Sequence, residues 1–82
     1  MRIVIQNCVS GEYLKSVGAH TEWTGDMKKA LRFRSSQAAM VCCVDNRIPH
    51  AQIVLKFDYD HDGEYDITLP VSRECKEVAG KL

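Results

Sequence analysis

The sequence lacks the features that would assign it at once to a familiar functional class. It has no apolar run approaching the roughly 18 residues of a membrane span, and residues 1–6 turn polar too early for a signal peptide. The G-x-S-x-G, P-loop and dinucleotide-binding signatures are also missing. These absences predict a cytoplasmic protein that is not an enzyme and has no membrane contact.

An excess of charge of either sign is missing too. Eleven acidic and eleven basic residues give a net charge of zero, so no overall field draws the chain to nucleic acid or to an anionic membrane. With 45% hydrophobic and 27% charged residues, the composition is that of an ordinary globular protein. We expect one small domain, residues 1–82, that is a monomer or a weak homodimer and has an unidentified protein partner.

The cysteines lack the C-x-x-C spacing of zinc sites and thioredoxin-type motifs. Cys42 and Cys43 are adjacent, and neighbours on a helix point about 100° apart, so one should be buried and the other nearer the surface. We expect all four cysteines to be reduced, small core residues. A disulfide between Cys8 and Cys75 is the alternative if the protein is exported.

Strands are predicted at both ends of the chain. Residues 2–7 are apolar and β-branched, and a turn at Ser10-Gly11 leads to a return strand at 13–17. In the last third, apolar residues alternate with polar ones over 51–58 and 64–71, which predicts a second hairpin around a polar loop. Pro70 lacks a backbone N–H, so its strand is expected at a sheet edge.

Helices are predicted in the middle of the chain. After a loop at 18–24, Thr24 can cap a short helix whose apolar stripe is Met27, Ala30 and Leu31. Residues 31–34 are expected to form a brief third strand. Ser35 or Ser36 then caps a more apolar helix over 37–45, which Asn46 and Pro49 terminate.

The resulting order is β-β-α-β-α-β-β, followed by a helical turn over 72–79. We therefore predict an α+β fold, with a mainly antiparallel sheet of four or five strands and one principal helix packed on one face. The first half of the chain also resembles a pattern that recurs in small uncharacterised bacterial and phage-borne proteins. The residues that carry this resemblance are Glu12, Tyr13, Leu14, Trp23, Thr24, Asp26, Ala30, Phe33, Ser35 and Ala39. It implies a two-layer core and no particular chemistry.

The loop of the second hairpin concentrates acidic residues in the spacing D-x-D-x-D-G-x-x-D. Calcium takes six to eight hard oxygen ligands, and alternate carboxylates on a tightly curled loop can aim at one point. The spacing resembles EF-hand loops and, more closely, the calcium loops between strands of integrin-type (FG-GAP) repeats. The resemblance implies that calcium is held by the side chains of Asp58, Asp60, Asp62 and Asp66 and by the main-chain carbonyl of Glu64.

Two departures weaken the comparison with an EF-hand. The flanking residues alternate as strands, and Leu69 stands where an EF-hand has a bidentate glutamate. Calcium affinity would therefore lie on the order of 10⁻⁴–10⁻³ M. The alternative is a plain hairpin turn, because Asp62-Gly63 is a strong turn dipeptide and acidic residues are common at loop tips.

A second charged cluster is basic: Lys28, Lys29, Arg32 and Arg34 lie close in sequence to Trp23 and Phe33. Such residues could contact phosphates and stack a base. Four charges on a neutral domain are few, however, and the solvated face of a helix is the favoured account of them. His20, His50 and His61 are scattered singly, which argues against zinc. The favoured function is thus a small non-enzymatic module that acts through macromolecular contacts, with calcium binding and weak nucleic-acid binding as alternatives.

Overall fold

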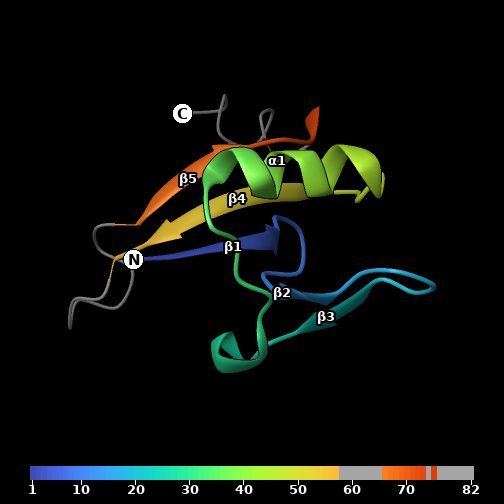
Figure 1. Ribbon diagram of the computed structural model, residues 1–82, viewed down its shortest axis with the longest axis horizontal. Coiled ribbons are helices and arrows are strands. Elements are labelled where there is room, and N and C mark those ends of the chain that lie inside the picture. Colours follow the sequence, from blue (N-terminus) through green and yellow to red (C-terminus); the bar gives the residue numbers. More distant parts are fainter. Residues whose placement is uncertain (58–65, 74, 76–82) are drawn as a thin grey trace.

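The computed structural model describes residues 1–57, 66–73 and 75 of the chain, and Figure 1 shows how their elements are arranged. In this part of the chain, an antiparallel sheet carries an α-helix on one face. The expected α+β class, with one principal helix, is therefore confirmed. The elements in chain order are β1 (Arg2–Asn7), β2 (Tyr13–Ser16), β3 (Glu22–Thr24), the 3₁₀ turn η1 (Met27–Lys29), α1 (Ser36–Asp45), β4 (Ala51–Lys56) and β5 (Ile67–Pro70).

The centre of the sheet is the pairing of β1 with β4. The five strands lie in the order β3-β2-β1-β4-β5. All six residues of β1 are in register with β4, from Arg2 opposite Lys56 to Asn7 opposite Ala51. The N-terminal strand and the C-terminal hairpin therefore share one core. β5 is an edge strand, as Pro70 predicted, and no helix among the described residues is long and apolar enough to cross a membrane.

One face of the sheet, called here the helix-side face, packs against α1. Directly opposite residues of an antiparallel pair project from the same face, so Ile5 of β1 and its partner Ile53 of β4 point together toward the helix. Ala39 and Cys43 of α1 meet them in the main core cluster. Because both helix residues are small, the helix axis can approach the sheet closely.

The other face, called here the open face, is partly covered by the segment around η1. Val4 and Val54 are buried there against Ala30, and Met27 and Tyr13 pack on the same small cluster. The two clusters show that the sheet buries apolar residues on both sides. α1 covers one side with a continuous helix, while the open face has a single helical turn.

The middle of the chain differs from its predicted order. The third strand is β3, inside the predicted loop, and residues 31–34 form no strand. Instead, the Leu31 N–H donates to the carbonyl of Leu14 (2.8 Å), and the Phe33 N–H donates to the carbonyl of Ile3 (2.9 Å). This extended segment thus bridges β2 and β1, and these bonds stop the preceding helix at one 3₁₀ turn. Asp26 caps that turn by accepting from the Lys28 N–H.

α1 begins and ends where the sequence predicted. The Ser35 hydroxyl accepts a hydrogen bond from the Ala38 N–H, and Asn46 is the C-terminal cap. Arg47 follows in the left-handed region with φ of 48°, and the Ile48 N–H donates to the carbonyl of Cys43 (3.1 Å). This is the Schellman arrangement, in which glycine is the usual residue at the position of Arg47. Burial of Ile48 beside Cys43 holds the helix end in the core.

Cys8 and Cys75 are joined by a disulfide across a sequence separation of 67 residues. The prediction that all four cysteines are reduced is therefore wrong for this pair. Cys8 follows β1 and Cys75 follows β5, and both strands pair with β4, so both cysteines reach the end of β4 that begins at Ala51. Cys42 and Cys43 are free; Cys43 is buried and Cys42 is less so, as predicted.

The chain after β5 is fastened to the same end of β4. The Ser72 hydroxyl accepts from the Ala51 N–H (2.8 Å), and the N–H groups of Val71 and Ser72 donate to the Ala51 carbonyl. The Cys75 N–H donates to the Ser72 carbonyl (3.1 Å), which is the start of the helical turn predicted over 72–79. Residues 74 and 76–79 lie outside the described residues.

Replacing both Cys8 and Cys75 by serine should lower the free energy of unfolding by about 4 kcal/mol, because a cross-link over such a long loop restricts the unfolded chain. Urea unfolding followed by tryptophan fluorescence measures this loss. A Cys42→Ser variant is the matched control and should keep most of the stability. Equal urea midpoints for the wild type with and without a thiol reductant would contradict the expectation.

Candidate interaction surface

The outer side of α1 is mostly apolar, although Gln37 lies on the same side and Asp45 is the last residue of the helix. Residues 36–44 contain no Asp, Glu, Lys or Arg. Ala39 and Cys43 face the sheet, whereas Met40, Val41 and Val44 are exposed, with Val44 at 64%. At 100° per residue, these three side chains span an arc of about 100° on the side of the helix away from the sheet. A helix that is apolar on all sides is typically buried on all sides.

A strip of the sheet beside α1 is also apolar and exposed. Ile67 and Leu69 of β5 lie directly opposite Leu55 and Ile53 of β4, so they project from the helix-side face. α1 packs over β1 and β4, and Ile67 and Leu69 remain 45% and 36% exposed. We call the two sets together the α1–β5 surface: Met40, Val41, Val44, Ile67 and Leu69.

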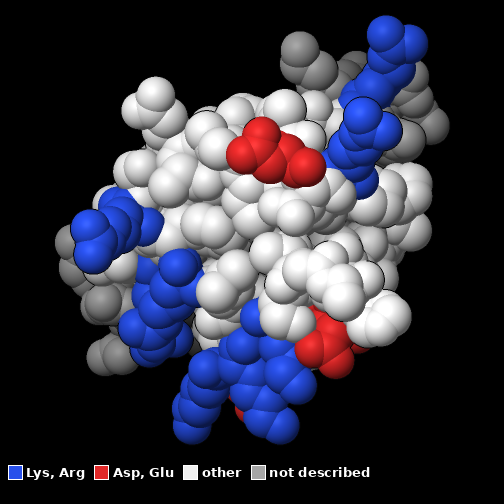
Figure 2. Space-filling model, turned by 45° about the vertical axis from the view of Figure 1, so that its right-hand side comes forward, with Lys and Arg blue, Asp and Glu red and all other residues white. Residues whose placement is uncertain are grey.

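Figure 2 shows an acidic group near the top centre of the face and Lys and Arg side chains along its left, lower and upper right margins. Most of that view is uncharged, and a group of Lys and Arg side chains lies at its lower end, the end that η1 occupies in Figure 1. Contiguous exposed apolar patches are uncommon on soluble monomers, and they mark contact sites when they are large. The α1–β5 surface therefore has the character of a binding surface.

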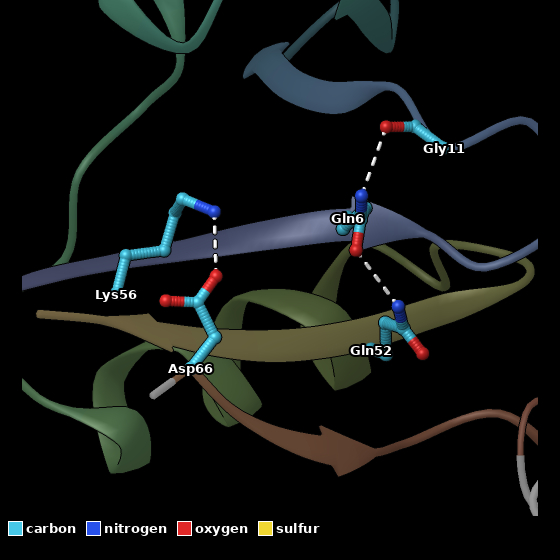
Figure 3. Close-up of polar contacts among 5 residues, drawn as sticks. All are labelled: Gln6, Gly11, Gln52, Lys56 and Asp66. Carbon is cyan, nitrogen blue, oxygen red and sulfur yellow. Dashed lines mark hydrogen bonds and ion pairs between the residues drawn. The ribbon is translucent and has the colours of Figure 1, made fainter. Parts of the chain in front are cut away.

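The open face carries a polar row instead (Figure 3). The Gln6 amide donates to the Gly11 carbonyl (2.9 Å) and accepts from the Gln52 amide (2.8 Å), which links β4, β1 and the following turn. Lys56 donates to the carboxylate of Asp66 at 2.6 Å. These bonds pair the side chains of Gln6, Gln52, Lys56 and Asp66 with one another or with the backbone.

The ammonium of Lys56 is held between two partners. Its Nζ contacts Asp66 and lies 5.8 Å from the ring centroid of Tyr13. Burial lowers the pKa of Lys56, but the hydrogen bond to Asp66 and the interactions with Tyr13 outweigh it, so the pKa is raised. The charged lysine is thus favoured at neutral pH, and it occupies one oxygen of Asp66.

The predicted calcium site can be placed at one residue only. Asp58, Asp60, Asp62 and Glu64 lie outside the described residues. Asp66 is described, and its carboxylate bonds Lys56. A calcium ion that used this carboxylate would compete with the lysine for it. Among the described residues, no group of three His, Cys, Asp or Glu side chains could hold a metal ion.

The scattered histidines fit that finding. His20 and His50 belong to no such group, and His61 lies outside the described range. The Nδ1 atom of His50 is buried and has no hydrogen-bond partner. The residue also has φ of 54°, which is unusual for a side chain with a Cβ. The carbonyl of His50 accepts a hydrogen bond from the Cys8 N–H (2.8 Å), which ties the turn between α1 and β4 to the end of β1.

The predicted basic cluster is exposed but lacks free aromatic rings. Lys28 and Lys29 lie on η1, and Arg32 and Arg34 lie on the extended segment that follows. Trp23 and Phe33 pack against the main core cluster, as expected for core aromatics. The cluster therefore offers charge for phosphates, while these two rings are engaged in packing. Nucleic-acid binding stays a prediction that no further observation favours.

Comparison with known proteins adds no assignment, since no protein family, curated protein or solved structure matches the chain. The α1–β5 surface was not among the predicted sites. Its signal was present in the uninterrupted apolar run of residues 38–44, which predicts a buried helix and leaves open what buries its second side.

The buried position of Cys43 predicts a distinct chemical behaviour. Burial, together with the neighbouring Cys42, raises the pKa of the Cys43 thiol from 9.0 to about 11. Stability from the neutral thiol is complete below pH 9 and is lost as the pH rises toward 11, because the unfolded chain ionises first. Alkylation of Cys43 by iodoacetamide, followed by mass spectrometry, should increase with a midpoint near 11 in the folded protein.

In urea, the same midpoint should fall to about 9, the ordinary value of a cysteine. A Cys42→Ser variant isolates the signal of Cys43. A native midpoint near 9 would show that the thiol is open to water and would contradict the packing of α1 on the sheet.

Proposed function

We propose that this protein is a small non-enzymatic module that acts by contact with another protein, and that the α1–β5 surface makes the contact. The observation that carries the proposal is the exposure of Met40, Val41 and Val44 on a helix whose one charged residue is the terminal Asp45, beside the exposed Ile67 and Leu69 of β5. Burial of apolar surface is the main favourable term in protein association.

The alternatives to a contact function find less support in the described residues. On the open face, the side chains of Gln6, Gln52, Lys56 and Asp66 are engaged in hydrogen bonds. The free cysteines have thiols whose pKa is raised by burial, and a thiolate is the form that acts as a nucleophile. These properties favour a binding role over catalysis.

The disulfide bears on where such a module works. Cytosolic reductants keep most thiols reduced, and structural disulfides persist in oxidising compartments. The Cys8–Cys75 bond therefore supports an oxidising compartment in place of the cytoplasmic location that the N-terminal residues predicted. This location also supplies the millimolar calcium that a weak calcium loop would need.

Site-specific photo-crosslinking in the native cell tests the contact function. A photoreactive amino acid at Val44 or Leu69 should capture a defined protein, identified by mass spectrometry, because both side chains are exposed in an apolar surface. Val9 is the control, since it is 72% exposed and apolar but lies in the turn after β1. Capture at position 9 as strong as at 44, or none at 44 and 69, would overturn the proposal.

Calcium binding is a second candidate, supported by the acid spacing of residues 58–66 and by the disulfide. The test is a calcium titration that follows the backbone amide of Asp66 by NMR. We expect saturation in the 10⁻⁴–10⁻³ M range. A Lys56→Met variant should bind several-fold more tightly, because it removes the cation that occupies the Asp66 carboxylate.

A Lys15→Met variant removes one positive charge elsewhere on the sheet and is the control for net charge. Calcium is added up to about 5 mM, well above the dissociation constants of weak extracellular calcium sites. If it shifts no amide resonance in the wild type or in the Lys56→Met variant, the calcium candidate fails. Equal affinities for the Lys56 and Lys15 variants would exclude Asp66 as a ligand.

A further inference from the structure

We propose that the partner of the α1–β5 surface is a second copy of this chain, and that the two α1 helices lie side by side in one layer between the two sheets. Each helix would rest on its own β1 and β4 and, with its outer side, on β5 of the other chain. This inference names the partner and so rests on the proposed function.

Among the described residues, α1 is covered on one side only. Its inner side, with Ala39 and Cys43, is covered by the sheet of its own chain. Its outer side carries Met40, Val41 and Val44 without a cover among the described residues. An α-helix that is apolar on opposite sides is suited to lie between two apolar layers. A second sheet supplies the missing layer.

The helix-side face of the sheet is wider than one helix can cover. Five strands at about 4.8 Å spacing make a sheet roughly 20 Å wide, whereas one helix covers about 10 Å. Beyond β1, Leu31, Phe33 and Trp23 pack against the main core cluster. Beyond β4, Ile67 and Leu69 remain exposed. Among residues 1–57, 66–73 and 75, the helix-side face is therefore least covered over β5, and one more helix would fit there.

The outer side of α1 and the exposed strip of β5 can cover each other in a pair of chains. Each chain offers a helix in need of a cover and a strip of sheet in need of a helix. In a dimer with two-fold symmetry, each contact occurs twice with the roles of the two copies exchanged. α1 of each copy can therefore cover β5 of the other. Both deficits are then removed by a single contact.

Charge is compatible with this self-association. A two-fold axis brings like surfaces together, so any charge in the contact meets its own copy nearby. The five residues of the α1–β5 surface are uncharged, and Asp45 at the C-terminal end of α1 is the one charged residue of that helix. Asp66, the charged residue that precedes β5, projects from the open face and pairs with Lys56.

The size of the surface sets the expected affinity. A standard interface buries roughly 800 Å² per partner, which is about one seventh of the 5773 Å² exposed by this chain. Two adjacent helices of ten residues cover an area of about 15 by 20 Å, roughly 300 Å² in projection, which is well below that standard size. The dimer should therefore be weak, with a dissociation constant in the micromolar range.

Sedimentation equilibrium over about 1 μM to 1 mM protein tests the association, because that span brackets a micromolar dissociation constant. The mass should rise from 9.3 kDa toward twice that value. Small-angle scattering should show the radius of gyration increasing from about 12.0 Å to about 15 Å, the value for a compact particle of twice 82 residues. A wild type that stays at 9.3 kDa up to 1 mM would overturn the inference.

Variants locate the contact. Val44→Glu and Leu69→Lys should each weaken the dimer about 30-fold or more, since each buries unpaired charges in the interface. Val9→Glu adds the same acid to an apolar residue that is 72% exposed and lies outside the surface, and it should dimerise like the wild type. Val41→Lys replaces Val44→Glu if that variant fails to fold.

Mixing the two variants tests the arrangement itself. In a heterodimer of Val44→Glu with Leu69→Lys, the glutamate on one helix meets the lysine on the other strand, while the second contact keeps its natural residues. The mixture should therefore dimerise more tightly than either variant alone. If the mixture stays as weak as the single variants, α1 does not lie on β5 of the other chain.

Failure of this inference differs from failure of the proposed function. A monomeric wild type whose position 44 still crosslinks a different protein refutes the second copy and leaves the contact function intact. A monomeric wild type without crosslinks at positions 44 and 69 refutes both. A large loss of monomer stability in Val44→Glu would show that the same chain covers the helix, which also overturns the inference.

Discussion

A sheet has two faces, and in its described residues this chain has one ten-residue helix with which to cover them. α1 lies over β1 and β4, the strands with the longest register, because the largest apolar side chains gather there. Shorter segments of the chain cover part of the remaining area of the two faces. An extended segment with Leu31 and Phe33 packs beyond β1, and a 3₁₀ turn covers part of the open face. In the described part of the chain, the strip over β5 receives no such cover, and the interaction surface follows from its exposure.

The sequence predicted the parts of the fold that depend on local patterns. Alternation identified β4 and β5, Ser35 was a recognisable cap for α1, and Pro70 indicated an edge strand. β3 escaped prediction because three residues are too few for a pattern, and its pairing with β2 is set by tertiary contacts. The helix predicted around Met27 is only a 3₁₀ turn for a similar reason. Backbone hydrogen bonds from Leu31 and Phe33 to distant strands override the local helix propensity.

The disulfide and the interaction surface both depend on strand order, which local patterns do not contain. Cys8 meets Cys75 because β1 and β5 flank β4 and end near Ala51. Met40, Val41 and Val44 lie near an exposed strip only because β5 is placed at the edge, beside the helix-covered strands. The apolar run of α1 could be recognised from the sequence, but which of its sides pack against other elements could not. For the acidic loop, the sequence pattern remains the basis of the calcium candidate.

In the proposed dimer, the outer side of α1 contacts β5 of a second copy. An isotope-filtered NOE experiment on a millimolar mixture of ¹³C-methyl-labelled and unlabelled chains tests it most directly, because only contacts between chains give signals. The account predicts cross-peaks between the methyl groups of Val44 on one chain and those of Ile67 or Leu69 on the other. A spectrum without intermolecular cross-peaks from Val44 would contradict it.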